Sequence, residues 1–255
     1  MLEIRNLSAG YPGKPVLDNI SLTLAESSVT AIVGPNGCGK STLLKSLAGI
    51  LPATGSAMLD GQELLTLPPR ELAKKVAFLP QSRPVPEITV KSLVLHGRFP
   101  YLSYPRRYRQ EDQAIAQAAM ETMGVADLAD RSLTSLSGGQ RQKVYIAMAL
   151  AQDTPVVLLD EPNSFLDISH QLQLMDLAKR LAAEGKTVVP VLHDLSLALE
   201  WADSIAVFRE GRCLLQGSPE AVFHSGCLSD AFGVRVQRMH TPYGWKYYFS
   251  GNSIL

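Results

Sequence analysis

The fold of this chain is constrained most by one stretch of sequence. In it an apolar run leads into a glycine-rich loop, and helical periodicity follows. Residues 29–33 (VTAIV) have the composition of a strand buried on both faces of a parallel sheet. Residues 34–42 (GPNGCGKST) fit the pattern G-x-x-x-x-G-K-[ST], and Leu43, Leu44 and Leu47 follow at helical spacing. Strand, loop and helix in this order predict a phosphate-binding P-loop rather than an incidental glycine-rich turn.

Each part of this P-loop has a physical role toward a nucleotide. Its glycines let backbone N–H groups approach phosphate oxygens, Lys40 supplies a positive charge to the β- and γ-phosphates, and the Ser41 hydroxyl is placed to bind Mg²⁺. The nucleotide-binding residues predicted here are Gly34, Pro35, Asn36, Gly37, Cys38, Gly39, Lys40, Ser41 and Thr42.

Two further apolar runs, residues 156–159 and 187–192, also read as buried strands, so the core is predicted to be an α/β parallel sheet. Pro190 lies within the second run and has no N–H to donate, which predicts a bulge or an edge position there. Residues 2–7 and 20–24 alternate between apolar and polar instead. This pattern predicts half-buried antiparallel strands at a sheet margin.

Residues 87–153 carry helical periodicity and almost no strand pattern, so we expect a helical insertion in the α/β core. The proline-rich residues 80–86 (PQSRPVP) lead into it and are expected to act as a hinge. The chain is thus predicted to be a single domain, with residues 1–86 and 154–255 as the core and 87–153 as a helical subdomain. The apolar stripe expected on the helix 110–123 consists of Ile115, Ala118, Ala119 and Met123.

Polar residues follow the apolar runs at their C-terminal ends. Asp160 and Glu161 end one run and His193 follows another, and parallel strands bring such ends, with Gly34, to one edge of the sheet. There an aspartate can hold Mg²⁺, a glutamate can polarise an attacking water, and a histidine can contact the γ-phosphate. Gln81, at the start of the hinge, can reach the metal or the water. Each of these residues also has a simpler interpretation. Asp160 and Glu161 can be a solvated strand exit, His193 a structural histidine, and Gln81 a polar loop residue.

Residues 136–140, the LSGGQ segment, form a second anion cradle. Ser137 has the character of a helix N-cap, Gly138 and Gly139 allow backbone N–H groups to approach an anion, and helical periodicity begins at Gln140. Two cradles with one nucleotide fold suggest half-sites that require a second copy of the chain.

The composition excludes several classes of partner. Twenty-four basic and twenty-four acidic residues balance, so no overall field attracts the chain to nucleic acid or to an anionic membrane. No segment approaches the roughly 18 consecutive apolar residues of a membrane helix, and the N-terminus lacks the pattern of a secretory signal. Three cysteines without metal-type spacing indicate free thiols in a reducing compartment, so we expect a cytosolic protein whose membrane association runs through a protein partner.

Taken in order, these elements resemble the complete motif set of the ATP-binding cassette (ABC) ATPases. The resemblance runs from Leu2 to about Gly217, and the tail beyond is less diagnostic. It implies a P-loop NTPase (RecA-like) core with an N-terminal antiparallel β region and an inserted helical subdomain, which binds ATP and Mg²⁺. The motifs that carry the resemblance are Tyr11, residues 34–42, Gln81, residues 136–140, 159–162 and 164–167, and His193.

In that family two subunits close head to tail around two ATP molecules. The resemblance implies that Tyr11 stacks on adenine, that Lys40 binds phosphates, and that Ser41, Gln81 and Asp160 serve Mg²⁺. The resemblance further implies that Ser137, Gly138 and Gly139 of the other subunit contact each ATP, and that Gln140 belongs to the same nucleotide-binding segment. It places Asp167 in the loop that links the two sites across the dimer.

The same resemblance assigns the catalytic steps. Glu161 corresponds to the general base, His193 to the γ-phosphate switch, and Gln81 acts with them. Asn163 and Phe165 stand where the family often has Thr and Ala. These departures affect the packing of residues 164–167, the dimer loop, rather than hydrolysis.

A narrower resemblance links residues 96–103 and 191–195 to the ATPases of bacterial importers for iron chelates (ferric siderophores and haem) and cobalamin. It implies permease subunits, an indirect link to a substrate-binding protein, and a peripheral location on the cytoplasmic face of the inner membrane. The residues expected to line the permease contact are Arg98, Arg106, Arg107 and Arg109.

Three other functions remain open at this point. A soluble ABC protein acting on ribosomes or DNA usually carries two cassettes or long insertions, and neither is present in this sequence. A small-molecule kinase or regulatory GTPase explains the P-loop but leaves the LSGGQ segment without a purpose. An exporter usually fuses its membrane helices to the cassette.

Overall fold

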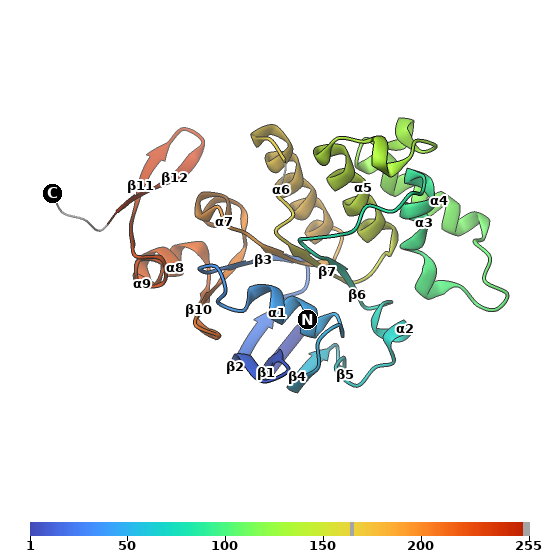
Figure 1. The fold of residues 1–255 in the computed structure, drawn as a ribbon. Helices are drawn as coiled ribbons and strands as arrows, with labels where there is room; N and C mark the ends of the chain where they lie inside the picture. Colours follow the sequence, from blue (N-terminus) through green and yellow to red (C-terminus); the bar gives the residue numbers. More distant parts are fainter. Residues whose placement is uncertain (164–165, 252–255) are drawn as a thin grey trace.

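The computed structural model describes residues 1–163 and 166–251, and within these residues its centre is a six-stranded sheet in the order β10-β9-β3-β8-β7-β6 (Figure 1). All neighbouring strands in it are parallel except β9 and β10, which form an antiparallel pair. The predicted parallel α/β core is therefore confirmed. The strands are β3 (Ser28–Val33), β6 (Val76–Leu79), β7 (Val156–Asp160), β8 (Thr187–Val191), β9 (Ser204–Arg209) and β10 (Arg212–Gly217).

Strand β8 is central, so the prediction that Pro190 marks an edge or a bulge is wrong. The ladder with β7 continues through Pro190, which lies opposite Leu159, without a change of register. The ladder with β3 has pairs at Val188 and Val191 but none between them. A proline can occupy this position because its missing N–H interrupts the ladder on one side only.

The N-terminal strands form a sheet of their own rather than the margin of the parallel sheet. Its antiparallel order is β2-β1-β4-β5, made of β1 (Leu2–Tyr11), β2 (Lys14–Leu24), β4 (Ala53–Leu59) and β5 (Gln62–Glu63). The P-loop helix α1 (Lys40–Leu47) lies between the two sheets, and its leucines share one buried cluster with side chains of both (Figure 1). This packing fixes the P-loop at the carboxyl end of β3.

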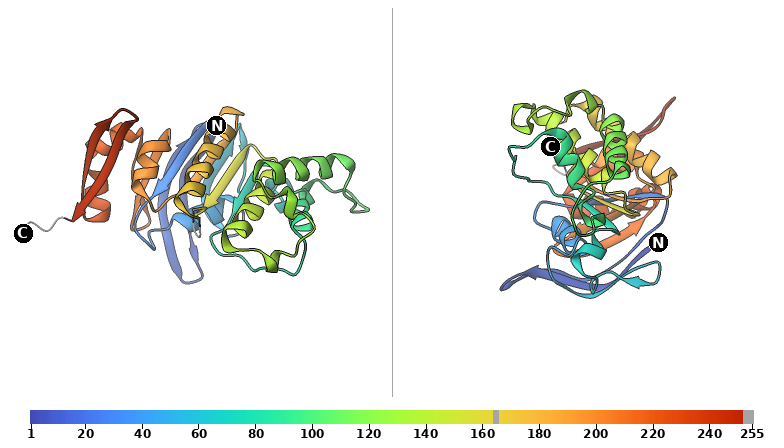
Figure 2. Two further views of the ribbon diagram at one scale, coloured as in Figure 1. Left: turned by 90° about the horizontal axis from the view of Figure 1, so that it is seen from above. Right: turned by 90° about the vertical axis from the view of Figure 1, so that its right-hand side faces the viewer.

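Strand β7 sends alternate side chains to opposite faces of the central sheet. Val156 and Leu158 join the cluster around α1, whereas Val157 and Leu159 join a cluster built by α3, α4, α5 and α6 on the other face. Figure 2 shows α3, α4 and α5 grouped toward one end of the molecule, with α6 nearer its middle. The helices are α3 (Val90–His96), α4 (Gln110–Thr122), α5 (Gly138–Ala151) and α6 (Ile168–Ala183); α2 (Pro69–Leu72) precedes them and α7 (Leu195–Trp201) follows β8.

Residues 87–153 are helical as predicted, with three short 3₁₀ helices between the longer ones. The stripe predicted on α4 is partly wrong, because Ala118 is exposed whereas Ala116, Ala119 and Met120 are buried. The buried face is thus rotated from the predicted one, since it also has to include the buried Asp112.

Arg98 is buried within the helical segment, so its predicted place in a permease contact is wrong. Its Nε lies 3.1 Å from Asp112 Oδ1, its Nη1 donates to the Ala151 carbonyl at 3.0 Å, and its guanidinium stacks 4.0 Å from the Tyr101 ring centroid. Arg106, Arg107 and Arg109 are exposed. The buried ion pair therefore joins α4 to the end of α5.

Removing one member of this ion pair is expected to destabilise the fold strongly. Asp112→Leu leaves the Arg98 guanidinium buried without its carboxylate, which costs about 3 to 5 kcal/mol of unfolding free energy. Urea unfolding measures the loss, with the exposed neighbour Glu111→Gln as the matched control. The double variant Arg98→Met/Asp112→Leu is expected to regain most of that stability. A loss below about 1 kcal/mol for Asp112→Leu would show that the pair is replaceable.

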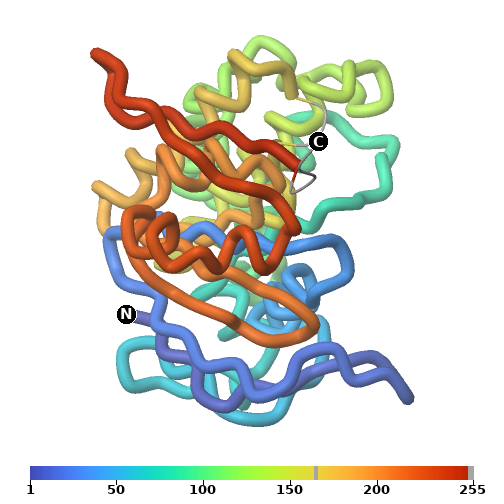
Figure 3. The backbone as a smooth tube through the Cα atoms, turned by 90° about the vertical axis from the view of Figure 1, so that its left-hand side faces the viewer, coloured from blue at the N-terminus to red at the C-terminus, as the bar shows by residue number. Residues whose placement is uncertain are grey.

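The described part of the chain ends in two short helices and a hairpin, which lie at the end of the molecule that faces the viewer in Figure 3. The hairpin packs on α7 and on the first of these two helices: Lys246 pairs with Glu200, Arg238 pairs with Glu220, and the Ser196 hydroxyl donates to the Tyr247 carbonyl at 3.3 Å. Among the described residues, no helix is both long and apolar enough to cross a membrane. The terminal elements are α8 (Pro219–Ser225), α9 (Cys227–Phe232), β11 (Val234–Thr241) and β12 (Gly244–Gly251).

Candidate functional site

The P-loop has the backbone of an anion cradle that only glycine permits at three positions. Gly37 and Gly39 have φ angles of 78° and 107°, in the left-handed region. At Gly34 an added Cβ would lie 2.4 Å from the carbonyl oxygen of Phe208 and 2.7 Å from Cys38 Sγ. A side chain at any of the three would displace the loop from the end of β3.

Lys40 lies at the start of α1 and points its ammonium back into the loop. The side chain is buried, and Nζ donates to the carbonyl oxygens of Gly34 at 2.7 Å and Pro35 at 3.0 Å. The charge therefore lies among the backbone groups that would surround a phosphate.

Ser41 and Asp160 meet across the sheet edge. The Ser41 hydroxyl donates to Asp160 Oδ1 at 2.9 Å, and Asp160 is buried. Burial raises the pKa of the Asp160 carboxyl; the Ser41 hydrogen bond opposes this shift and the neighbouring Glu161 adds to it. A hydroxyl and a carboxylate so placed fit the oxygen ligands that Mg²⁺ prefers, and a cation there would relieve the cost of the buried charge.

Glu161 is held by two side chains from the neighbouring strand ends. Gln81 Nε2 donates to its Oε2, and His193 Nε2 lies 2.5 Å from its Oε1. Glu161 itself has a φ of 51°, in the left-handed region that non-glycine residues rarely adopt. These three predicted residues are thus brought together beside Asp160.

Tyr11 ends strand β1 and is 43% exposed, so much of its ring is accessible. Lys45, one turn beyond the P-loop on α1, places Nζ 3.4 Å from the Tyr11 hydroxyl and 6.0 Å from the ring centroid. The aromatic face therefore lies on the α1 side of the site, accessible to a flat ligand.

The LSGGQ segment forms a double N-cap on α5. The Ser137 hydroxyl accepts from the Gln140 N–H at 3.2 Å, and Gln140 Oε1 accepts from the Ser137 N–H at 3.1 Å. In the described part of the chain no hydrogen bond or ion pair joins these residues to the P-loop. Because α5 and α1 pack on opposite faces of the central sheet, the two cradles of one chain are not brought together.

Asp167 caps α6. Its Oδ1 accepts from the His170 N–H at 2.9 Å, and this bond, with the His170 side chain, lowers the pKa of the Asp167 carboxyl despite slight desolvation. The predicted dimer loop also includes Ser164 and Phe165, which lie outside the described residues.

Three residues near the site escaped prediction from the sequence: Arg83 in the hinge, and Gln142 and Tyr145 on α5. Gln142 is buried, and its two amide atoms bond to the Pro162 carbonyl and to Arg83. A glutamine on the core-facing side of an otherwise apolar helix face is the signal that could have revealed it.

Fold and site together define a nucleotide-binding domain with a P-loop, a carboxylate pair at a strand end and a separate glycine-rich helix cap. Comparison with known proteins agrees: residues 17–164 match the model of the ABC transporter family. The chain therefore belongs to the ABC transporter family, as one of the ATP-binding subunits that hydrolyse ATP to drive transport.

Two relatives and one solved structure illustrate the similarity. The ferric enterobactin transport ATP-binding protein of Escherichia coli (strain K12) is 41% identical over 239 residues, 92% of this chain and 88% of that protein. The hemin import ATP-binding protein of Nocardia farcinica (strain IFM 10152) is 41% identical over 243 residues, 94% of this chain and 84% of that one. A structure described as a metal-chelate type ABC transporter, inward-facing, superposes with a TM-score of 0.83 at 28% identity, covering 98% of this chain and 96% of that chain.

Proposed function

We propose that this chain is the ATPase subunit of an importer for an iron chelate, a ferric siderophore or haem. The observation that carries the proposal is the junction of Ser41 with Asp160 and of Glu161 with Gln81 and His193 at one sheet edge. The relatives named for enterobactin and hemin transport support the class of substrate.

Within this proposal the P-loop and Lys40 bind the phosphates, and Tyr11 stacks on the adenine. Ser41 and Asp160, joined by Gln81, would hold Mg²⁺, which neutralises charge on the β- and γ-phosphates. Glu161 accepts the proton of the attacking water, and His193 holds the Glu161 carboxylate in place beside the γ-phosphate.

The LSGGQ segment acts on the nucleotide of a second copy. Its N–H groups, at the positive end of the 14-residue helix α5, suit a phosphate, yet its own P-loop lies on the opposite side of the sheet. We therefore propose a head-to-tail homodimer, with Asp167 near the junction of the two sites. ATP that bridges both halves adds contacts found only in the closed dimer, which shifts the equilibrium toward closure.

Coupling to the membrane runs through the helical segment, which we treat as a subdomain formed by residues 87–153 between core segments 1–86 and 154–255. The exposed Arg106, Arg107 and Arg109 remain candidates for the permease contact. The subunit would then lie on the cytoplasmic face of the inner membrane, held there by the permease, with the substrate-binding protein as an indirect partner.

Co-purification with the permease, followed by ATPase assays in proteoliposomes, tests this function. We expect a binding protein loaded with one ferric siderophore or with haem to stimulate hydrolysis several-fold over the unloaded protein. Stimulation by loaded cobalamin-binding protein alone would change the substrate class. Absence of any co-purifying membrane subunit would contradict the importer and favour a soluble ABC ATPase.

A further inference from the structure

Gln142 ties the start of helix α5 to the catalytic strand end. Gln142 lies on the first turns of α5, is 4% exposed, and donates from Nε2 to the Pro162 carbonyl at 2.7 Å. Its Oε1 accepts from Arg83 Nη2, also at 2.7 Å. A flipped amide would set donor against donor and acceptor against acceptor, so both bonds require this one orientation.

Arg83 and Tyr145 fasten the hinge loop to the same helix. The Arg83 guanidinium stacks 4.3 Å from the Tyr145 ring centroid, and the Tyr145 hydroxyl donates to the Pro84 carbonyl at 2.5 Å. Arg83 is half-buried, and this burial lowers the pKa of its guanidinium to about 10. The loop is thus held to α5 by directed bonds.

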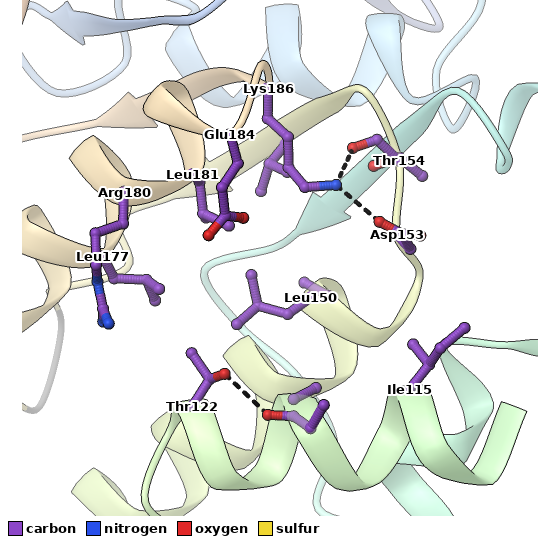
Figure 4. Close-up of a pocket in the computed structure, with 14 residues that line it drawn as sticks. Ile115, Thr122, Leu150, Asp153, Thr154, Leu177, Arg180, Leu181, Glu184 and Lys186 are labelled. Carbon is purple, nitrogen blue, oxygen red and sulfur yellow. Dashed lines mark hydrogen bonds and ion pairs between the residues drawn. The ribbon is translucent and has the colours of Figure 1, made fainter. Parts of the chain in front are cut away.

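Apolar packing holds most of α5 to the core, whereas its first turns and the hinge loop border an open pocket. A cavity of about 430 Å³ adjoins the hinge loop and the first turns of α5. Farther along, a pocket of about 330 Å³ is lined by residues of α4, α5 and α6, among them Leu150, Leu177 and Leu181, and by the pair Lys186–Asp153 (Figure 4). At the α5 start, the bonds of Gln142 and Arg83 are therefore the directed contacts that join the helix to the hinge loop and to the strand end.

These bonds close a ring around the general base. Gln81 contacts the Glu161 carboxylate; two residues later Arg83 contacts Gln142; and Gln142 contacts Pro162, the residue after Glu161. Glu161 lies within the ring in a left-handed backbone conformation, which persists only where surrounding contacts fix it. A displacement of the α5 N-terminus thus reaches Glu161 through one side chain.

We infer that Gln142 is a positioning residue that transmits the position of the LSGGQ cap and the hinge loop to Glu161. The inference rests on the proposed function, because it assigns to Gln142 an effect on the hydrolysis step. The inference gives two events a physical route to the catalytic carboxylate. One is binding of a partner's nucleotide at Ser137, and the other is binding of a permease at the hinge. Glu161 remains the catalytic residue, and Gln142 acts through it.

The test compares Gln142→Leu with Gln152→Leu, a matched control at the other end of α5. The Gln152 amide also crosses to the core, donating to the Ala73 carbonyl at 2.6 Å and the Val76 carbonyl at 3.0 Å, but away from Glu161. In the complete transporter we expect Gln142→Leu to lower kcat for ATP by about 10- to 100-fold with KM changed less than about twofold. Gln152→Leu should keep the wild-type kcat, since its bonds do not reach Glu161.

A second arm asks whether Gln142 acts through Glu161. In a Glu161→Gln background, Gln142→Leu should cause almost no further fall in kcat, because both changes affect one group. Arg83→Met, which keeps packing on Tyr145 but loses one bond of the ring, should lower kcat in the same direction even if Gln142→Leu folds poorly.

The outcomes separate this inference from the proposed function. A normal kcat in folded Gln142→Leu or Arg83→Met would overturn the inference. So would a fall in kcat caused by Gln142→Leu that is equally large in the wild type and in the Glu161→Gln background. In both cases the ATPase assignment stands. A wild-type transporter that hydrolyses no ATP would overturn the proposed function itself.

Discussion

Glu161→Gln is expected to lower the ATP turnover number by about 10²- to 10⁴-fold while ATP binding persists. Glutamine keeps the size of the side chain and can still lie beside Gln81 and His193, but it cannot accept the proton of the attacking water. Steady-state hydrolysis and equilibrium binding of a fluorescent ATP analogue measure the two effects separately.

Glu210→Gln is the matched control for this variant. Glu210 also has a left-handed φ, 49°, but its carboxylate is exposed and pairs only with Arg209 in the described part of the chain. Its turnover should equal that of the wild type. Near-normal hydrolysis by Glu161→Gln would instead remove Glu161 as the general base.

Mixing two inactive variants should restore hydrolysis if each site takes residues from two chains. Lys40→Ala disables the P-loop half and Ser137→Arg the LSGGQ half, so a head-to-tail heterodimer of the two has one site with neither defect. Random pairing then predicts about a quarter of the wild-type activity, if the two sites work independently. Ser137→Arg also removes the α5 cap, at a cost of about 1 kcal/mol, which unfolding measurements will show.

A mixture of Lys40→Ala with Glu161→Gln provides the control. Lys40, at the start of α1, and Glu161, just after β7, both belong to the P-loop half of a site, so each site of the heterodimer keeps one defect. This mixture should stay inactive. Recovery in both mixtures, or in neither, would contradict the shared site.

The sequence alone predicted those features whose evidence lies within one contiguous segment. The P-loop, the strand ends at Asp160 and His193 and the Ser137 cap each carry their signal in a few neighbouring residues. Parallel strands then bring separate ends together by topology, which is why the Ser41–Asp160 contact follows from the predicted sheet.

Features that depend on distant partners were missed or misjudged. A glutamine on an apolar helix face signals a buried polar contact at Gln142, but its partners Pro162 and Arg83 lie 20 and 59 positions away, so the sequence does not identify them. Arg98 looked like a surface cation, yet Asp112 lies 14 positions away on α4 and draws it inside. The bulge or edge predicted at Pro190 is wrong because the sequence does not show that a missing N–H can interrupt the ladder on one side of a central strand only.

Sedimentation of the Glu161→Gln protein with ATP and Mg²⁺ tests the central claim, that one subunit lends its LSGGQ segment to the site of another. Since hydrolysis is blocked, bound ATP should hold the two halves closed, and the protein should sediment with twice the mass of one chain, carrying two ATP molecules. Adding Ser137→Arg should return it to a monomer. A Glu161→Gln protein that binds ATP and remains monomeric at every concentration would contradict the account.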